Sequence, residues 1–314
     1  MCVACDYTIH RRDHHYGWSR DFAPAVVAKS GSTIHFECLD SSGGQLGTGS
    51  TVADVINLDF AKVNPVTGPV YVEGAAPGDV LKVEIREFVP SGIGWTAVIP
   101  GFGLLADQFT DPALHIWTYD PGTMAPSLFG PGGSVPLKPF AGTIGVAPSE
   151  PGVHSVVPPR RVGGNLDIRD PSSGVTLYLP VEVEGALFSV GDTHAAQGDG
   201  EVCGTAIESA MNVTLTLSVL KGQTLESPRF TTPGPVTRHL DAAGYEVTTG
   251  VGPDLMTASR EALSRMIDLL SREHGYAPAD AYMLCSVAGD LRISEIVDMP
   301  NVVVSFYFPR IVLQ

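Results

Sequence analysis

The chain has 314 residues, enough for one large domain or a few small ones, and its hydrophobic content of 44% is typical of a globular protein rather than a disordered chain. Its formal charge of −15 argues against nucleic acid and anionic lipid as partners. The 35 glycines and 25 prolines predict many turns, which favours a strand-rich chain over a helical bundle.

The N-terminal segment MCVACDYTIHRRDHH lacks the apolar stretch of a secretory signal, and no stretch of the chain reaches the roughly 20 apolar residues of a membrane span. Five scattered cysteines do not fit a disulfide framework, and Cys2 and Cys5 form a CxxC without a second pair to complete a zinc site. We therefore expect incidental thiols there, a packed or disordered tail around His10, His14 and His15, and a reducing, cytoplasmic location.

Most of the chain up to residue 222 reads as strands. Alternating or continuous apolar runs predict strands at six places, namely 33–38, 70–73, 79–89, 175–183, 186–190 and 213–219. The segment 90–140 is rich in glycine and proline, so we expect a loop-rich insertion that serves as a lid or as an oligomer contact.

The C-terminal part changes character. Residues 257–274 have the apolar spacing of an amphipathic helix, capped by Thr257 or Ser259 and ended by Gly275. A second helix is expected to start at Pro278, because proline is favourable at the first helical position, and a final strand follows.

The predicted fold class is therefore β-rich α+β. Sandwich- or barrel-like strands form a catalytic portion over 1–222, and a smaller α+β portion over 223–314 packs with it as one compact unit.

The densest group of ionisable residues lies at 192–201. Asp192 and His194 are two residues apart, so in an extended segment their side chains point to the same side, and an imidazole beside a carboxylate is a natural ligand pair for zinc or another divalent metal. Gly198 and Gly200 allow the backbone to approach a bound group. An exposed polar turn is the alternative, and the position between two apolar strands leaves the two interpretations evenly balanced.

Three further acids are candidates. Asp167 ends the turn GGNLD, Glu150 lies between prolines and is a candidate general base, and Glu208 lies at the start of an apolar strand, where a carboxylate needs a partner. Each of the first two also fits an ordinary surface turn.

Evidence for a nucleophile is weaker. No GxSxG motif occurs, and the Ser41–Gly44 segment shares only a short serine- and glycine-rich stretch with serine amidases, so we predict a turn there. Acids near Cys203 would raise the pKa of its thiol, which argues against a thiolate nucleophile.

The segment GDTHAAQGDGEVCGTAIE at 191–208 resembles the signature of the acetamidase/formamidase family. Four further blocks resemble that family in the same order, namely NPVTGPVYVEGAAPGD, GTIGVAPSEPG, PPRRVGGNLD and CSVAGDLRISEIVD. The resemblance runs from about residue 20 to 310. It implies a β-rich α+β fold, hydrolysis of small linear amides, or also lactams, to a carboxylate and ammonia or an amine, a divalent metal with zinc expected, and a homo-oligomer.

The resemblance also implies roles for particular residues. Those implied as metal ligands are Asp167, Asp192, His194 and Glu208; as catalytic residues, Glu150 and Asp199; and as substrate contacts, Gln197, Gly198 and Gly200. Glu201 also matches the motif, with no specific role, and Asn64 departs from it, because many relatives carry His there. The alternatives are a non-catalytic protein that binds a metal or small ligand, and a hydrolase that depends on Cys203.

Overall fold

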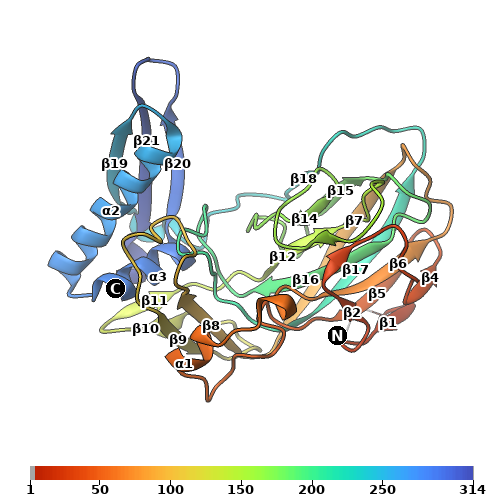
Figure 1. Cartoon of the computed structure of the whole chain (residues 1–314), viewed down its shortest axis with the longest axis horizontal. Helices are drawn as coiled ribbons and strands as arrows, with labels where there is room; N and C mark the ends of the chain where they lie inside the picture. Colours follow the sequence, from red (N-terminus) through yellow and green to blue (C-terminus); the bar gives the residue numbers. More distant parts are fainter. Residues whose placement is uncertain (1–3, 314) are drawn as a thin grey trace.

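The computed structural model describes residues 4–313, so Cys2 of the predicted CxxC lies outside the described residues. Two six-stranded sheets dominate the molecule and pack face to face, while the C-terminal helices and strands form a second body beside them (Figure 1). This arrangement confirms the predicted β-rich α+β class.

The first sheet has the strand order β1–β5–β17–β7–β15–β18. Its strands are β1 (Tyr7–Ile9), β5 (Ser32–Glu37), β7 (Val80–Pro90), β15 (Thr176–Pro180), β17 (Met211–Leu220) and β18 (Arg229–Thr231). The alternation that predicted β5, β7 and β17 buries one face of each strand, as with Leu81, Val83 and Ile85 of β7.

The second sheet has the order β14–β12–β16–β6–β2, with β4 also paired to β6. Its strands are β2 (His14–His15), β4 (Val26–Ala28), β6 (Val66–Val72), β12 (Phe140–Gly145), β14 (Gly163–Asn165) and β16 (Phe188–His194). Phe36 of the first sheet meets Phe188 of the second edge to face in the core between them. Of the N-terminal histidines, His15 packs against this sheet, with its Nε2 2.9 Å from Ser189 Oγ of β16, whereas His10 is exposed.

The segment 90–140 is more regular than its composition suggested. It forms two hairpins, β8 (Ile93–Val98) with β9 (Ala113–Thr118) and β10 (Ser127–Phe129) with β11 (Gly133–Val135). Trp117 and Phe129 stack in a buried cluster and anchor them. Tertiary packing of these aromatic residues overrides the local preference for loops. The remaining short elements are α1 (Val52–Ile56), η1 (Phe60–Lys62), and the pair β3 (Gly17–Trp18) and β13 (His154–Ser155).

The C-terminal part is a three-stranded sheet covered by helices. Its elements are η2 (Asp241–Ala243), β19 (Tyr245–Gly252), α2 (Leu255–His274), α3 (Pro278–Ala288), β20 (Asp290–Glu295), β21 (Val302–Pro309) and η3 (Arg310–Leu313). Both helices and the final strand lie where the sequence predicted them, and Gly275 ends α2 in the left-handed conformation. The predicted cap was wrong: Asp254, not Thr257 or Ser259, caps α2 by accepting a hydrogen bond from the Thr257 amide at 2.8 Å.

The C-terminal helices share a core with the segment 191–208. Met266 of α2 and Tyr282 of α3 are buried in one cluster with Ala195 and Cys203. The tail therefore buttresses the segment that was predicted to carry the chemistry. The division into portions 1–222 and 223–314 stays a prediction, as do the homo-oligomer and the cytoplasmic location. Within residues 4–313, the helices all fall short of the length and apolar character needed to cross a bilayer.

Candidate active site

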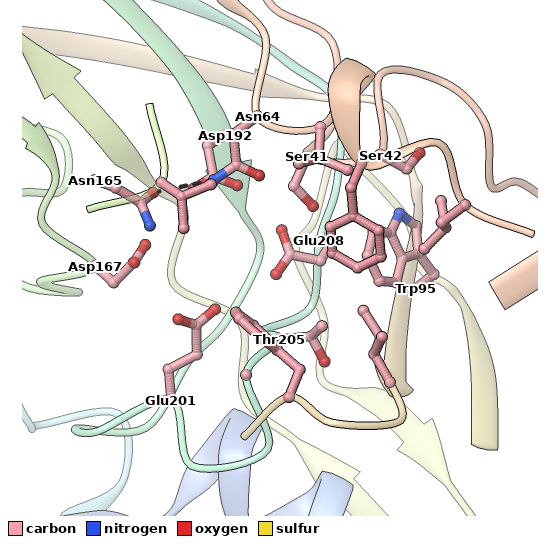
Figure 2. Close-up of a pocket in the computed structure, with 17 residues that line it drawn as sticks. Ser41, Ser42, Asn64, Trp95, Asn165, Asp167, Asp192, Glu201, Thr205 and Glu208 are labelled. Atoms are coloured by element: carbon pink, nitrogen blue, oxygen red, sulfur yellow. Dashed lines mark hydrogen bonds between the residues drawn. The ribbon is translucent and has the colours of Figure 1, made fainter. Parts of the chain in front are cut away.

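A cavity of about 140 Å³ opens beside the end of β16 (Figure 2). One wall is polar and is formed by Ser41, Ser42, Asn64, Asn165, Asp167, Asp192, Glu201, Thr205 and Glu208. The rest of the lining side chains are apolar and are those of Leu58, Phe60, Val63, Trp95, Ile99, Phe102 and Val157. Among residues 4–313, no lysine or arginine lines it. We call these the acid wall and the apolar wall.

The end of β16 and the returning chain bring three of the predicted ligands together. Asp192 and His194 lie on β16, and after the loop that follows, the chain forms a bridge that places Glu208 opposite His194. His194 is fully buried, and its Nε2 lies 3.1 Å from Asp192 Oδ1 and 3.1 Å from Glu208 Oε2. Two carboxylate oxygens thus converge on one ring nitrogen.

Gln197 fixes the orientation of this imidazole. Its side-chain Oε1 lies 2.9 Å from His194 Nδ1, and its Nε2 donates to the carbonyl of Asp167 at 2.7 Å. Because that carbonyl can only accept, the amide is oriented with its oxygen toward the ring, so Nδ1 carries the proton of a neutral His194. The Nε2 lone pair is then left facing the two carboxylates, as a metal ligand requires.

The second oxygen of Asp192 is held by neutral donors. Thr143 Oγ1 donates to Asp192 Oδ2 at 3.1 Å, and Asn64 Nδ2 donates to the same oxygen at 3.4 Å. Asn165, two residues before Asp167, accepts from Asn64 Nδ2 through its Oδ1, and the same oxygen shares the single Thr143 hydroxyl proton with Asp192. This network orients Asp192 without neutralising it.

Charge in the cavity is strongly unbalanced. Burial, then the charge of Asp192, raises the pKa of Asp167 to about 7, and burial raises the pKa values of Glu201 and Glu208 as well. Although burial alone lowers it, the charges of Glu208 and Asp192 raise the pKa of His194 well above its ordinary value. Every shift has the same meaning: the site stabilises added positive charge.

The donor set fits a divalent cation. Asp167 Oδ1 and Glu208 Oε2 are buried and make no hydrogen bond within residues 4–313. A Cβ on Gly142 would approach Asp167 Oδ1 to 2.4 Å and Asp192 Oδ2 to 2.9 Å, so only glycine leaves this space free. Two sets of atoms are close enough to hold an ion, namely Asp192–His194–Glu208 and Asp167–His194–Glu201. The groups are therefore suited to bind a metal, while the identity of the ion is open.

Backbone strain is concentrated at this site. Seven non-glycine residues among those described have a positive φ, and four of them line the cavity: Asn64 (49°), Asp167 (48°), Asp192 (50°) and Glu201 (43°). Such conformations persist only where surrounding structure imposes them, and they are common in functional sites.

Not every predicted residue reaches the cavity. Glu150 is exposed in the turn after β12 and is absent from both walls, so it does not lie where a general base must contact the reacting water. At Glu150, an acid between two prolines therefore indicates an exposed surface turn and not a catalytic position.

Asp199, Gly198 and Gly200 face the C-terminal part instead. Asp199 forms an ion pair with Arg169 at 3.4 Å, half-exposed and outside the cavity. A Cβ on Gly198 would lie 1.8 Å from the carbonyl oxygen of Gly289, and Gly200 packs against Leu291. Close packing against the C-terminal part, rather than substrate contact, explains both glycines. Gln197 likewise contacts His194 instead of lining the cavity.

Cys203 does not have the properties of a nucleophile. It is fully buried, lies outside the cavity walls, and its Sγ is 3.6 Å from the carbonyl of Ala97. Burial raises the pKa of this thiol to about 11, which suppresses the thiolate.

Several polar residues of the acid wall had no role assigned from the sequence, among them Glu201, Asn165 and Ser41. Glu201 matches the family signature, which is only a weak indication of a role. Asn165 also carries an indication in the sequence, because it precedes Asp167 by two residues in the same turn. Ser41 was interpreted only as part of a turn.

Comparison with known proteins gives a consistent result. The model of the Acetamidase/Formamidase family matches residues 5–156 and 150–314. An acetamidase of Mycolicibacterium smegmatis is 31% identical over 71% of this chain and 70% of its own length, and a formamidase of Methylophilus methylotrophus is 28% identical over 97% and 89%. Among solved structures, a gamma lactamase from Delftia acidovorans superposes with a TM-score of 0.90 at 26% identity, covering 98% of this chain and 93% of that one.

Proposed function

Because the chain belongs to the acetamidase/formamidase family and is an amidase, we propose that it hydrolyses the C–N bond of small amides with the help of a divalent metal held at the acid wall. The products are a carboxylate and ammonia, or an amine where the nitrogen is substituted. The observation that carries the proposal is the convergence of Asp192 and Glu208 on His194 Nε2, each at 3.1 Å. Family membership sets aside the non-catalytic alternative.

The residues that would hold the ion are Asp167, Asp192, His194 and Glu208. Imidazole and carboxylate donors suit zinc, which is the expected ion. When bound, it supplies a Lewis acid that polarises an amide carbonyl and lowers the pKa of water. Gln197 would not bind the ion itself. It accepts a hydrogen bond from His194 Nδ1 and so keeps the ring in the tautomer that leaves Nε2 free.

Glu201 is the proposed proton carrier, in place of Glu150 and Asp199. It lines the cavity, and burial, then the charge of Asp167, raises its pKa well above the ordinary value. A carboxylate with a raised pKa takes a proton from water more readily. Glu201 thus accepts the proton of the attacking water and returns it to the leaving nitrogen, which departs as ammonia.

The shape of the cavity indicates which amides fit. A volume of about 140 Å³ is close to that of a cavity that holds benzene, so the substrate is small. The acyl group lies against the apolar wall, and the amide group faces the acid wall. Four carboxylates exclude substrates that carry their own carboxylate. Because one structural relative is named a gamma lactamase, lactams belong among the compounds to test.

The proposal is tested by measuring metal content and ammonia release on the same sample, with formamide, acetamide and butyramide as substrates and ring opening of a γ-lactam followed separately. We expect a bound divalent ion, loss of turnover with EDTA, and recovery with zinc. Activity that survives complete removal of metal contradicts the proposal.

The proton carrier is tested with a matched pair of variants. Glu201→Gln should retain the metal and lose roughly 100-fold or more in kcat, within the range usual for general acid–base catalysis. Glu150→Gln makes the same chemical change at the exposed position and should match the wild type. The reverse result would restore the role that the sequence predicted for Glu150.

A further inference from the structure

Two polar groups of the cavity make no hydrogen bond within residues 4–313 and are used neither by the proposed metal site nor by the proposed proton carrier, namely the Ser41 hydroxyl and Trp95 Nε1. Trp95 Nε1 has the Asp40 carboxylate as a neighbouring acceptor, which leaves the Ser41 hydroxyl as the group without one. Ser41 lines the cavity with only 8% of its surface exposed, and its Oγ makes no hydrogen bond within residues 4–313. Figure 2 shows it on the Trp95 side of the cavity, across from Asp167. Buried hydroxyls nearly always have a partner, so an unpaired one requires an explanation.

The turn that carries Ser41 is held firmly. The Asp40 carboxylate accepts hydrogen bonds from the Ser42 amide at 2.7 Å and from the Ser42 hydroxyl. The Ser41 carbonyl accepts from the Asn64 amide at 2.7 Å. Ser41 therefore cannot move easily to find another partner for its hydroxyl.

The neighbouring serine shows what a satisfied hydroxyl looks like in the same turn. Ser42 also lines the cavity, but its Oγ donates to Asp40 and accepts from the Leu46 amide at 3.0 Å. One serine thus stabilises the turn, and the adjacent one is left with a free hydroxyl in the cavity. This contrast within two residues argues that the unpaired state of Ser41 is specific.

An amide substrate offers the partner that Ser41 lacks. The ionised acids of the wall are acceptors only, whereas an amide carbonyl oxygen requires a donor. The Asn64 amide group is already committed to Asn165 and Asp192, and the Thr205 hydroxyl donates to the Ala97 carbonyl. The Ser41 O–H is uncommitted, and it lines the cavity across from Asp167, so an amide group between the two can reach it (Figure 2).

We propose that Ser41 is a substrate-binding residue whose hydroxyl donates a hydrogen bond to the amide carbonyl oxygen, orienting the acyl group toward the apolar wall. The role rests on the proposed amide hydrolysis. Because the carbonyl oxygen becomes more negative as water adds to the carbon, the hydrogen bond strengthens toward the transition state.

Two adjacent variants test this assignment with acetamide and the zinc-loaded enzyme. Ser41→Ala should keep its metal, keep or raise its Tm, and lose about 100-fold in kcat/KM, as loss of an oxyanion donor does elsewhere. Ser42→Ala should instead lower the Tm, because it removes two hydrogen bonds from the turn. A Ser41→Ala enzyme within about twofold of wild-type kcat/KM, or one destabilised as much as Ser42→Ala, overturns the assignment.

The outcome is separable from that of the proposed function. If the wild type binds acetamide without hydrolysing it, calorimetric titration with acetamide decides the role of Ser41: about tenfold weaker binding by Ser41→Ala supports it, and equal binding overturns it. If the wild type neither binds nor hydrolyses acetamide or the other amides tested, both proposals fail together.

Discussion

Two charged clusters with buried members lie close together in this protein, and they differ in how their charge is balanced. The acid wall contains four carboxylates around His194, with oxygens that lack partners. The second cluster, which we call the Arg169 cluster, consists of Arg169, Asp199 and Asp290. Arg169 and Asp290 are almost fully buried and form a two-pronged ion pair, with Nη2 and Oδ2 2.9 Å apart.

This difference distinguishes a cluster that stabilises the fold from one that is suited to bind a ligand. The Arg169 cluster supplies its own counter-ions and connects the loop after β16 to the start of β20, where Asp290 also accepts from the Asp199 amide at 3.1 Å. The negative charge of the acid wall, in contrast, requires a cation or another ligand from outside the chain to balance it. A buried charge that is paired within the protein indicates a structural tie, whereas an unpaired excess of one sign indicates a ligand.

The largest effect is expected at the acid wall. His194→Ala should lose bound metal and at least about 1,000-fold in kcat/KM, because metal assistance is worth several kcal/mol and each tenfold change is about 1.4 kcal/mol. Metal analysis and ammonia release measure both. His274→Ala, at an exposed position of α2, is the matched control. A His194→Ala enzyme that keeps its metal would remove the basis for treating the acid wall as a metal site.

The Arg169 cluster should respond in stability instead. Arg169→Met leaves the buried Asp290 with only the partly exposed Arg292, 3.3 Å away, as a cationic partner, which costs about 3 kcal/mol, or a Tm lower by on the order of 10 °C. Arg272→Met, exposed on α2, should change the Tm little. If Arg169→Met instead loses metal while its Tm is unchanged, the two clusters are one functional unit and the contrast between them is wrong.

The smallest effect is a dependence of stability on pH to which the acid wall contributes. Its raised pKa values mean that the folded, metal-free protein holds protons more tightly than the unfolded chain. The stabilising contribution of Asp167 is therefore complete below about pH 4 and is lost as pH rises toward its pKa of about 7. Protonation of His194 acts in the same direction.

Thermal unfolding between pH 5 and 8 measures this effect. Relative to metal-free Asp167→Asn, the Tm of the EDTA-treated wild type should fall by at least about 2 °C as pH rises, because a change of 1 kcal/mol has that size in larger domains. His15 and His239, whose pKa values burial lowers to about 4, act in the opposite direction but equally in both proteins. The zinc-loaded protein should diverge upward as pH rises, since deprotonated ligands bind metal better. If the curve of the metal-free wild type runs parallel to that of metal-free Asp167→Asn, the titration does not belong to Asp167.

Predictions from the sequence succeeded where local pattern and tertiary structure agree. The strands β5, β7 and β17 and the helices α2 and α3 follow from the spacing of their apolar residues. The proximity of Asp192 and His194 follows from their spacing along one strand. The hairpins at 90–140 were missed because aromatic packing between distant residues, not local propensity, holds them.

The sequence by itself determined the family, the class of fold and the segment that carries the chemistry. The family follows from long motifs. The class of fold and the segment follow from patterns that are local in the chain. Only the tertiary structure decided which acids meet. Glu201 enters the cavity, whereas Glu150 and Asp199 lie outside it, although all three are acids in glycine- or proline-rich turns. The direction of a side chain in such a turn depends on how the chain returns and on what packs behind it, and neither is encoded within the turn itself.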